Sequence, residues 1–187
     1  MAALRFGPLV FLALLAVATA AAQAPSRVRG TITAASAGGD VISVDNKVQV
    51  RLSEQTQIVF AQPIALADIK PGDFLGVTSI KAADGGLSAY EVRRFPQPLN
   101  PGHRPFDGRD DQTMTNARVG AVVQSASGRE LVLVYNGGTQ RITVPPSASV
   151  SELVPGNRTQ LVPGAAVNLT HDANRVAIRI QVSPTRQ

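Results

Sequence analysis

Two segments of this chain carry the same features in the same order, and that correspondence limits the possible folds more than any single motif does. They flank residues 96–117, a run with four prolines and no apolar periodicity. The match places Val28 with Val119 and, at one constant offset through the later part, Pro63 with Pro155. We interpret the chain as a duplication and expect both segments to fold alike.

Short alternating patterns predict β-strands in both segments. Apolar and polar residues alternate over residues 48–52 and again over residues 176–182, which is the period-two pattern of a half-buried strand. Turn residues such as Asn136-Gly137-Gly138 separate the patterns. The best helical candidate, residues 65–70, is about one turn long and is ended by Pro71-Gly72. We predict an all-β fold with about five short strands in each segment.

The order of these elements favours a closed barrel. Three strands, a short crossing and two further strands follow one another in small barrels such as the OB-fold. A segment of about 65 residues can bury its sheet edges only by closing on itself, although a β-sandwich is the competing architecture. We predict two small OB-like five-stranded β-barrels in tandem, at residues 23–95 and 118–187, joined by an ordered linker at residues 96–117.

The first 22 residues match an export signal. Arg5 gives a basic start, residues 9–17 form an apolar core, and Ala20-Ala21-Ala22 offers small residues for cleavage. The apolar run is shorter than the about 20 residues that cross a membrane, which favours a cleaved signal over a membrane anchor. An uncleaved anchor is the alternative. We expect residues 1–22 to be a signal peptide and the mature chain to lack a membrane span. In a bacterium with an outer membrane, the mature chain would reside in the periplasm.

Composition excludes several kinds of site. The chain has no cysteine, so disulfides, thiolate metal sites and cysteine nucleophiles are excluded. It has fifteen arginines and three lysines, but these are spread along the chain, so they predict only weak attraction to anionic surfaces. Only 4% of the residues are aromatic. Nucleic-acid binding is therefore disfavoured, because single strands are held by a positive groove with aromatic stacking platforms.

Several motifs resemble known bacterial families. The patterns R-V-x-G-x-I from residue 27, L-A-D-I-K-P-G-D-F at residues 66–74 and G-L-S-A-Y-E-V at residues 86–92 resemble the small β-barrel domains called domain of unknown function 5666. G-H-R-P-F-D at residues 102–107 and M-T-N-A at residues 114–117 are similar to an exported proteobacterial family that usually has tryptophan where this chain has Phe106. The resemblance covers nearly the whole mature chain. It implies a fold and a compartment, and no activity comes with it.

The stretch at residues 96–117 is the candidate for specific binding, because connecting segments carry function on rigid scaffolds. It is long for a connector without regular structure. We expect it to be ordered against both barrels, with Phe106 buried between them and Met114 packed. We predict a surface for an envelope protein partner, and the candidate interaction residues are His103, Arg104, Phe106, Asp107, Met114 and Asn116.

A metal site is the alternative for this stretch. His103 and Asp107, joined by His171 if folding brings it near, could hold a divalent metal ion. Their spacing matches no standard ligand motif. The competing interpretation is a structural linker in which Arg104 and Arg109 pair with carboxylates and His103 caps a turn. Otherwise no cofactor is expected.

Catalytic constellations are not recognisable in the sequence. No serine lies in a G-x-S-x-G turn, and neither a phosphate-binding loop nor a dinucleotide fingerprint occurs. Asp110 and Asp111 are adjacent, and adjacent side chains on an extended chain point to opposite sides. We therefore predict a non-catalytic, exported binding or assembly module rather than an enzyme.

Overall fold

The computed structural model describes residues 24–125 and 128–184, so the expected signal peptide lies outside the described residues. The described chain is all-β, with thirteen strands and two single-turn 3-10 helices (η), as the alternating patterns predict. No helix within these residues is long and apolar enough to cross a membrane. In chain order the elements are β1 (Ser26–Ala35), β2 (Val41–Val44), β3 (Val48–Arg51), β4 (Gln57–Pro63), η1 (Leu66–Asp68), β5 (Phe74–Lys81), β6 (Leu87–Phe95), β7 (Gly102–Phe106), β8 (Arg109–Ser125), β9 (Gly128–Tyr135), β10 (Gly138–Val144), β11 (Ser149–Pro155), η2 (Arg158–Gln160), β12 (Ala166–His171) and β13 (Ala177–Ser183).

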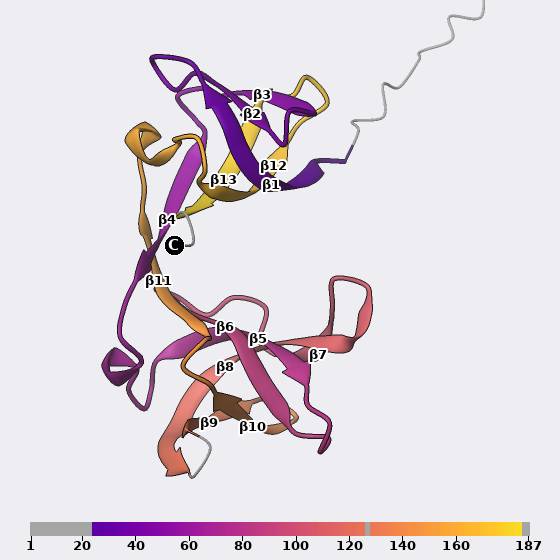
Figure 1. Ribbon diagram of the computed structural model, residues 1–187, viewed down its shortest axis with the longest axis vertical. Coiled ribbons are helices and arrows are strands. Elements are labelled where there is room, and N and C mark those ends of the chain that lie inside the picture. The colour runs from indigo at the N-terminus through magenta and orange to yellow at the C-terminus, as the bar shows by residue number, and fades with distance from the viewer. Residues whose placement is uncertain (1–23, 126–127, 185–187) are drawn as a thin grey trace, which may run out of the picture.

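The described strands join into one mixed sheet that folds into two lobes (Figure 1). In the ring lobe, β6, β5, β8, β9 and β10 follow one another, and a parallel contact of Thr143 with Ser88 closes these five described strands into a ring. The terminal lobe contains β1, β2, β3, β12 and β13. Its β3 ends at a parallel bridge between Arg51 and Val176, next to the start of β13.

Both lobes draw strands from both halves of the chain. The hydrophobic core of the terminal lobe combines side chains such as Ile42 and Val50 with Leu169 and Ile180 from more than 100 residues later. The core of the ring lobe likewise joins side chains of β5 and β6 to those of β8, β9 and β10. We expected each segment to close on itself. Instead β4 runs on from one lobe to the other, because it pairs along its length first with β13 and then with β11.

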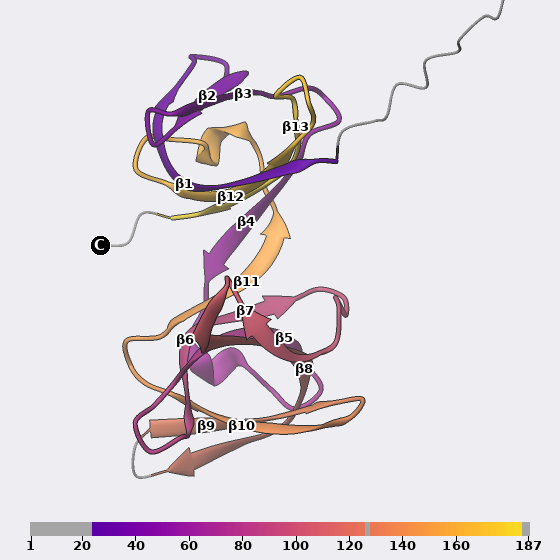
Figure 2. The ribbon, with the colours of Figure 1, turned by 90° about the vertical axis from the view of Figure 1, so that its right-hand side faces the viewer.

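The crossing is a two-stranded ribbon of β4 and β11, which lie side by side between the lobes (Figure 2). Ala61 and Leu153 are opposite each other in this antiparallel pair. Beyond the ribbon, β4 runs parallel to β13 in the terminal lobe, and β11 runs parallel to β6 in the ring lobe. The pairing around the crossing is therefore the same on both sides.

Two long strands contain a bulge and have different neighbours along their length. In β1 the pairing register shifts between Ile32 and Ala34, and in β8 it shifts between Val119 and Ala121. A bulge adds one unpaired residue and a local bend. β1 pairs with β12 over residues 26–31 and with β2 from Ile32 onward, while β8 pairs with β5 up to Arg118 and with β9 from Arg118 onward.

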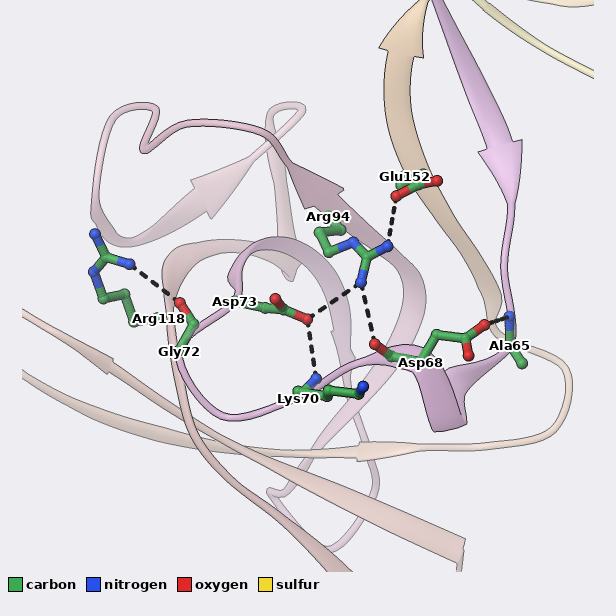
Figure 3. A network of polar contacts seen from close by, with 8 residues as sticks. All are labelled: Ala65, Asp68, Lys70, Gly72, Asp73, Arg94, Arg118 and Glu152. Atoms are coloured by element: carbon green, nitrogen blue, oxygen red, sulfur yellow. Dashed lines mark hydrogen bonds and ion pairs between the residues drawn. The ribbon is translucent and has the colours of Figure 1, made fainter.

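Arg94 fixes the entry of the crossing ribbon into the ring lobe (Figure 3). Its guanidinium donates to the carbonyl oxygen of Asp68 at 3.1 Å, to Asp73 Oδ2 at 3.5 Å and to Glu152 Oε2 at 2.5 Å. The bond to Glu152 is the largest cause that raises the pKa of Arg94 above its ordinary value. One side chain of β6 thus ties the loop around η1 to β11.

Candidate binding cleft

Residues 102–116 form a β-hairpin, whereas we expected a connector without regular structure up to residue 117. β7 and β8 are joined by Asp107 and Gly108, whose φ angles are 62° and 68°. Two central residues with positive φ make the type I′ turn that suits the twist of a hairpin, and Asp-Gly is a preferred pair for it. The dipeptide is a hairpin signal in the sequence that our prediction did not use.

The tip of this hairpin reaches the terminal lobe. Arg29 of β1 donates to Asp107 Oδ1 at 2.8 Å, and the carbon of its guanidinium lies 5.0 Å from the centroid of the Phe106 ring. Both partners of the ion pair are partly exposed, at 37% and 54%, so the pair contributes about 1 kcal/mol or less. Phe106 is half-buried rather than enclosed. The hairpin therefore contacts both lobes, since β8 also pairs with β5 of the ring lobe.

The other candidate residues hold the hairpin to the ring lobe. His103 Nδ1 lies 2.8 Å from Thr115 Oγ1 on the neighbouring strand, and burial lowers the pKa of His103 below its ordinary value. Met114 is half-buried, with its sulfur 4.0 Å from the Thr78 hydroxyl. His103 thus bonds across the hairpin, whereas the linker interpretation had it cap a turn.

Asn116 is the most enclosed of the six candidates, at 4% exposure. Its amide donates to the carbonyl oxygens of Leu99 at 2.9 Å and Asn100 at 3.2 Å. Arg104 also donates to the carbonyl of Asn100, at 3.2 Å. These bonds order the residues that precede β7, so Asn116 positions the hairpin from within.

The two histidines and Asp107 each have a separate local partner. His171 Nδ1 lies 2.6 Å from the carbonyl oxygen of Asp172, while His103 contacts Thr115 and Asp107 contacts Arg29. Within the described residues no group of three or more His, Cys, Asp or Glu side chains could hold a metal ion. The folded chain therefore does not assemble the three expected ligands into such a group.

A cleft of about 790 Å³ separates the lobes and is lined by the hairpin. Its walls are alternate residues of neighbouring strands: Arg179, Gln181 and Ser183 on β13, and Glu91, Arg93 and Phe95 on β6. Alternate side chains of a strand share one face of its sheet, and the intervening Ile180 and Val92 are buried in the cores. The cleft is therefore built on the outer faces of both lobes, which meet across the crossing ribbon.

Arginine dominates the described lining of the cleft. The lining contains six arginines, the two carboxylates of Glu91 and Asp107, and no lysine. The six are Arg27, Arg29, Arg93, Arg104, Arg109 and Arg179. This gives the described wall an excess of four positive charges, and a concave wall of one sign raises the local concentration of oppositely charged groups.

Some of these arginines are already engaged within the molecule. Arg109 donates to both carboxylate oxygens of Asp111, at 3.0 and 2.9 Å, and this pairing lowers the pKa of Asp111. By contrast, Arg27 and Arg179 are exposed and have no hydrogen-bond or ion-pair partner within the described part of the chain. These two guanidiniums are open to a ligand.

Arg93 is the most buried of the six arginines of the cleft, with 15% of its side chain exposed. Burial is the largest cause that lowers its pKa from the ordinary value, opposed by the neighbouring charge of Glu91 and reinforced by that of Arg29. The Gln181 amide is placed so that its oxygen faces the donors of Arg93. In this orientation the oxygen accepts hydrogen bonds from both terminal nitrogens of Arg93, at 2.6 and 3.1 Å. Arg93 and Gln181 thus connect the two lobes across the floor of the cleft.

Sequence analysis found the hairpin side of the cleft and missed the opposite wall. Arg27 is far in the chain from Thr170 and Arg179, and antiparallel pairing of three strands brings all three into one row. The alternation of residues 176–182 marks Arg179 as outward-facing. The turn between β12 and β13 is a local signal that places these two strands side by side, but nothing local in the sequence shows that β1 lies on the other side of β12.

Comparison with known proteins finds no matching family, no similar curated protein and no similar solved structure. The resemblance to the small β-barrel domains therefore stays a prediction.

Proposed function

We propose that this protein is an exported, non-catalytic binding module of the cell envelope that holds a partner protein in the cleft between its lobes. In this proposal each lobe is a small OB-like barrel built from strands of both segments, and the β7–β8 hairpin with Phe106 and Arg104 forms part of the contact surface. The single observation that carries the proposal is the arginine-rich, concave wall shared by the two lobes.

The kinds of side chain in the cleft favour a protein as the partner. Protein interfaces are enriched in arginine, tyrosine, phenylalanine and methionine and depleted in lysine. The lining includes Tyr90, Phe95, Phe106 and Met114 beside the arginines, and no lysine among the described residues. Tyrosine and arginine are also the residues that most often dominate binding energy.

The test is affinity capture from envelope extracts, with the partner identified by mass spectrometry. Wild type is compared with Phe106→Ala and with Val134→Ala, an exposed apolar residue of β9 that does not line the cleft. We expect Phe106→Ala to lose partners that Val134→Ala retains. Identical partner lists for all three proteins would count against the proposal.

Export is tested separately. We expect a tagged full-length chain to fractionate with the periplasm and its purified amino terminus to begin near residue 23, because residues 20–22 are small enough for cleavage. A chain that keeps Met1, or that remains in the cytoplasmic fraction, would contradict this part of the proposal.

A further inference from the structure

We infer that the cleft binds an acidic, extended segment of the partner protein, and that Arg27 and Arg179 bind its carboxylates. The inference rests on the proposed function, because it names the chemistry by which the partner would be recognised. Both arginines lie on the wall of the cleft formed by the terminal lobe.

The molecule already contains one such contact. At the hairpin tip, a phenylalanine–aspartate pair from the ring lobe meets Arg29 of the terminal lobe, with the Asp107 carboxylate at 2.8 Å and the Phe106 ring 5.0 Å away. The outer face of the terminal lobe therefore binds an acidic residue that the turn of a β-hairpin brings to it. Arg27 is two residues before Arg29 on the same face and has no such partner within the described chain.

The open arginines are spaced for more than one carboxylate. Arg27 lies opposite Thr170, and Thr170 lies opposite Arg179 on the next strand. Neighbouring strands are about 4.8 Å apart, so the two arginine stems stand about 10 Å apart with the Thr170 hydroxyl between them. Along β1, residues two apart are separated by about 6.8 Å, which is also the spacing of alternate side chains in an extended ligand. Acidic side chains at every second position would therefore match this wall.

The choice of arginine favours carboxylates over a diffuse negative charge. A guanidinium presents a planar fork that binds both oxygens of a carboxylate, which a lysine ammonium cannot do. Arg109 makes this two-oxygen contact with Asp111. Three of the six arginines are paired with Asp107, Glu91 or Asp111, so Arg27, Arg104 and Arg179 are the lining cations without a carboxylate partner in the described chain.

Recognition through side chains also fits the edge of the hairpin. β7 pairs with β8 and with no other strand of the described sheet, so one of its edges is open. That strand contains Pro105, which has no N–H to donate to an added strand. Proline in an edge strand is a common obstacle to edge-to-edge pairing. We therefore expect the partner segment to be held by its carboxylates rather than by strand addition to β7.

The test uses a short synthetic peptide in which glutamate alternates with threonine, titrated into the mature chain by isothermal calorimetry. The double variant Arg27→Ser/Arg179→Ser is expected to bind it at least about tenfold more weakly, since hydrogen bonds to charged groups each contribute about 1.5–3 kcal/mol. The charge-matched control is Arg51→Ser/Arg141→Ser, two exposed arginines outside the cleft. It should keep the wild-type affinity.

Three further arms separate the possible results. Replacing the glutamates of the peptide by glutamine should abolish binding. In Arg27→Lys/Arg179→Lys, which keeps the charge, an affinity several-fold below wild type is expected because the fork is lost. Inorganic phosphate is titrated as a competing oxyanion. The inference would be overturned if the chain bound phosphate but not the peptide. It would also be overturned if both double serine variants lost the same amount of peptide affinity.

A peptide that does not bind at all would also overturn this inference. It would leave the proposed function open to its own test, because the capture experiment with Phe106→Ala does not depend on acidic peptides. Conversely, peptide binding that is lost in Arg27→Ser/Arg179→Ser supports the inference even if Phe106 makes no contribution to partner capture.

Discussion

Ala61 of β4 and Leu153 of β11 lie opposite each other where the chain crosses between the lobes, and their exposures are 2% and 7%. Each of the two strands continues from this contact into a different lobe. The contact is therefore shared by both halves of the molecule, and the stability of the lobes is coupled through it.

Leu153→Ala is expected to destabilise the whole molecule. Truncation of a buried leucine costs about 2–5 kcal/mol, and the lower part of that range applies here because one side of Leu153 lines the cleft. Urea denaturation followed by circular dichroism should show one transition at lower urea, with the lobes unfolding together. Val134→Ala, exposed on β9, should shift the free energy of unfolding by no more than about 0.5 kcal/mol. Two separated transitions in Leu153→Ala would contradict the coupling.

Each lobe combines strands from both halves of the chain, which predicts fragment complementation. A chain divided at the hairpin turn gives residues 24–107 and 108–184, and each hydrophobic core needs side chains from both fragments. Each fragment alone should be unfolded by circular dichroism, while an equimolar mixture refolded together should give one folded complex by gel filtration. A fragment of residues 24–95 that folds cooperatively by itself would rule out this dependence.

The sequence predicts the strands because strand patterns are local. The alternation at residues 48–52 becomes β3 and that at residues 176–182 becomes β13. The choice of partner strands is not local. A strand with one apolar face can close against the next strands of its own segment or against those of a similar segment, and the same alternation satisfies both. Nothing in the pattern of β4 indicates that it runs across to the other lobe.

The sequence also does not show which residues of the two segments occupy equivalent positions in their strands. We aligned Val28 with Val119 by residue type, but Ile32 is the residue whose backbone environment matches that of Val119. Ile32 exchanges two backbone hydrogen bonds with residues 164–165, and Val119 exchanges two with residues 72–73. Because apolar β-branched residues recur along a strand, side-chain type alone does not fix which one makes the equivalent bonds. The Asp107-Gly108 turn, by contrast, was available as a local signal.

Arg94→Met tests the polar network at the entry of the crossing ribbon. The substitution keeps most of the aliphatic volume but leaves Asp73 and Glu152 without their shared cation. All three side chains are about one quarter exposed, so solvent screening reduces the expected loss to about 1–2 kcal/mol of unfolding free energy. Arg141→Met, which removes a more exposed pair with Glu130, should cost less than about 0.5 kcal/mol in the same urea titration. Equal losses would show that the network does not act as a unit.

Asn116→Ala should loosen the start of the hairpin. The variant leaves the carbonyl groups of Leu99 and Asn100 without their amide donor, and loss of a buried polar partner costs about 1–3 kcal/mol. Limited proteolysis should cut the variant first within residues 96–101, where wild type resists. Asn174→Ala, an exposed turn residue of the terminal lobe, serves as the control. Early cleavage in wild type at the same site would mean that the stretch before β7 is loose even with Asn116 in place.

His103 predicts a pH dependence of stability. Burial lowers its pKa in the folded chain below the ordinary value of about 6.5. As the pH falls below about 6.5, the unfolded chain takes up a proton on this ring while the folded chain stays neutral, so stability decreases until the pH passes the folded pKa. His103→Gln should flatten the dependence of the urea midpoint on pH in that window. The resonances of the His103 ring followed by NMR should give a pKa below the ordinary value of histidine. Parallel pH profiles for wild type and His103→Gln would show that burial does not disfavour the charged ring.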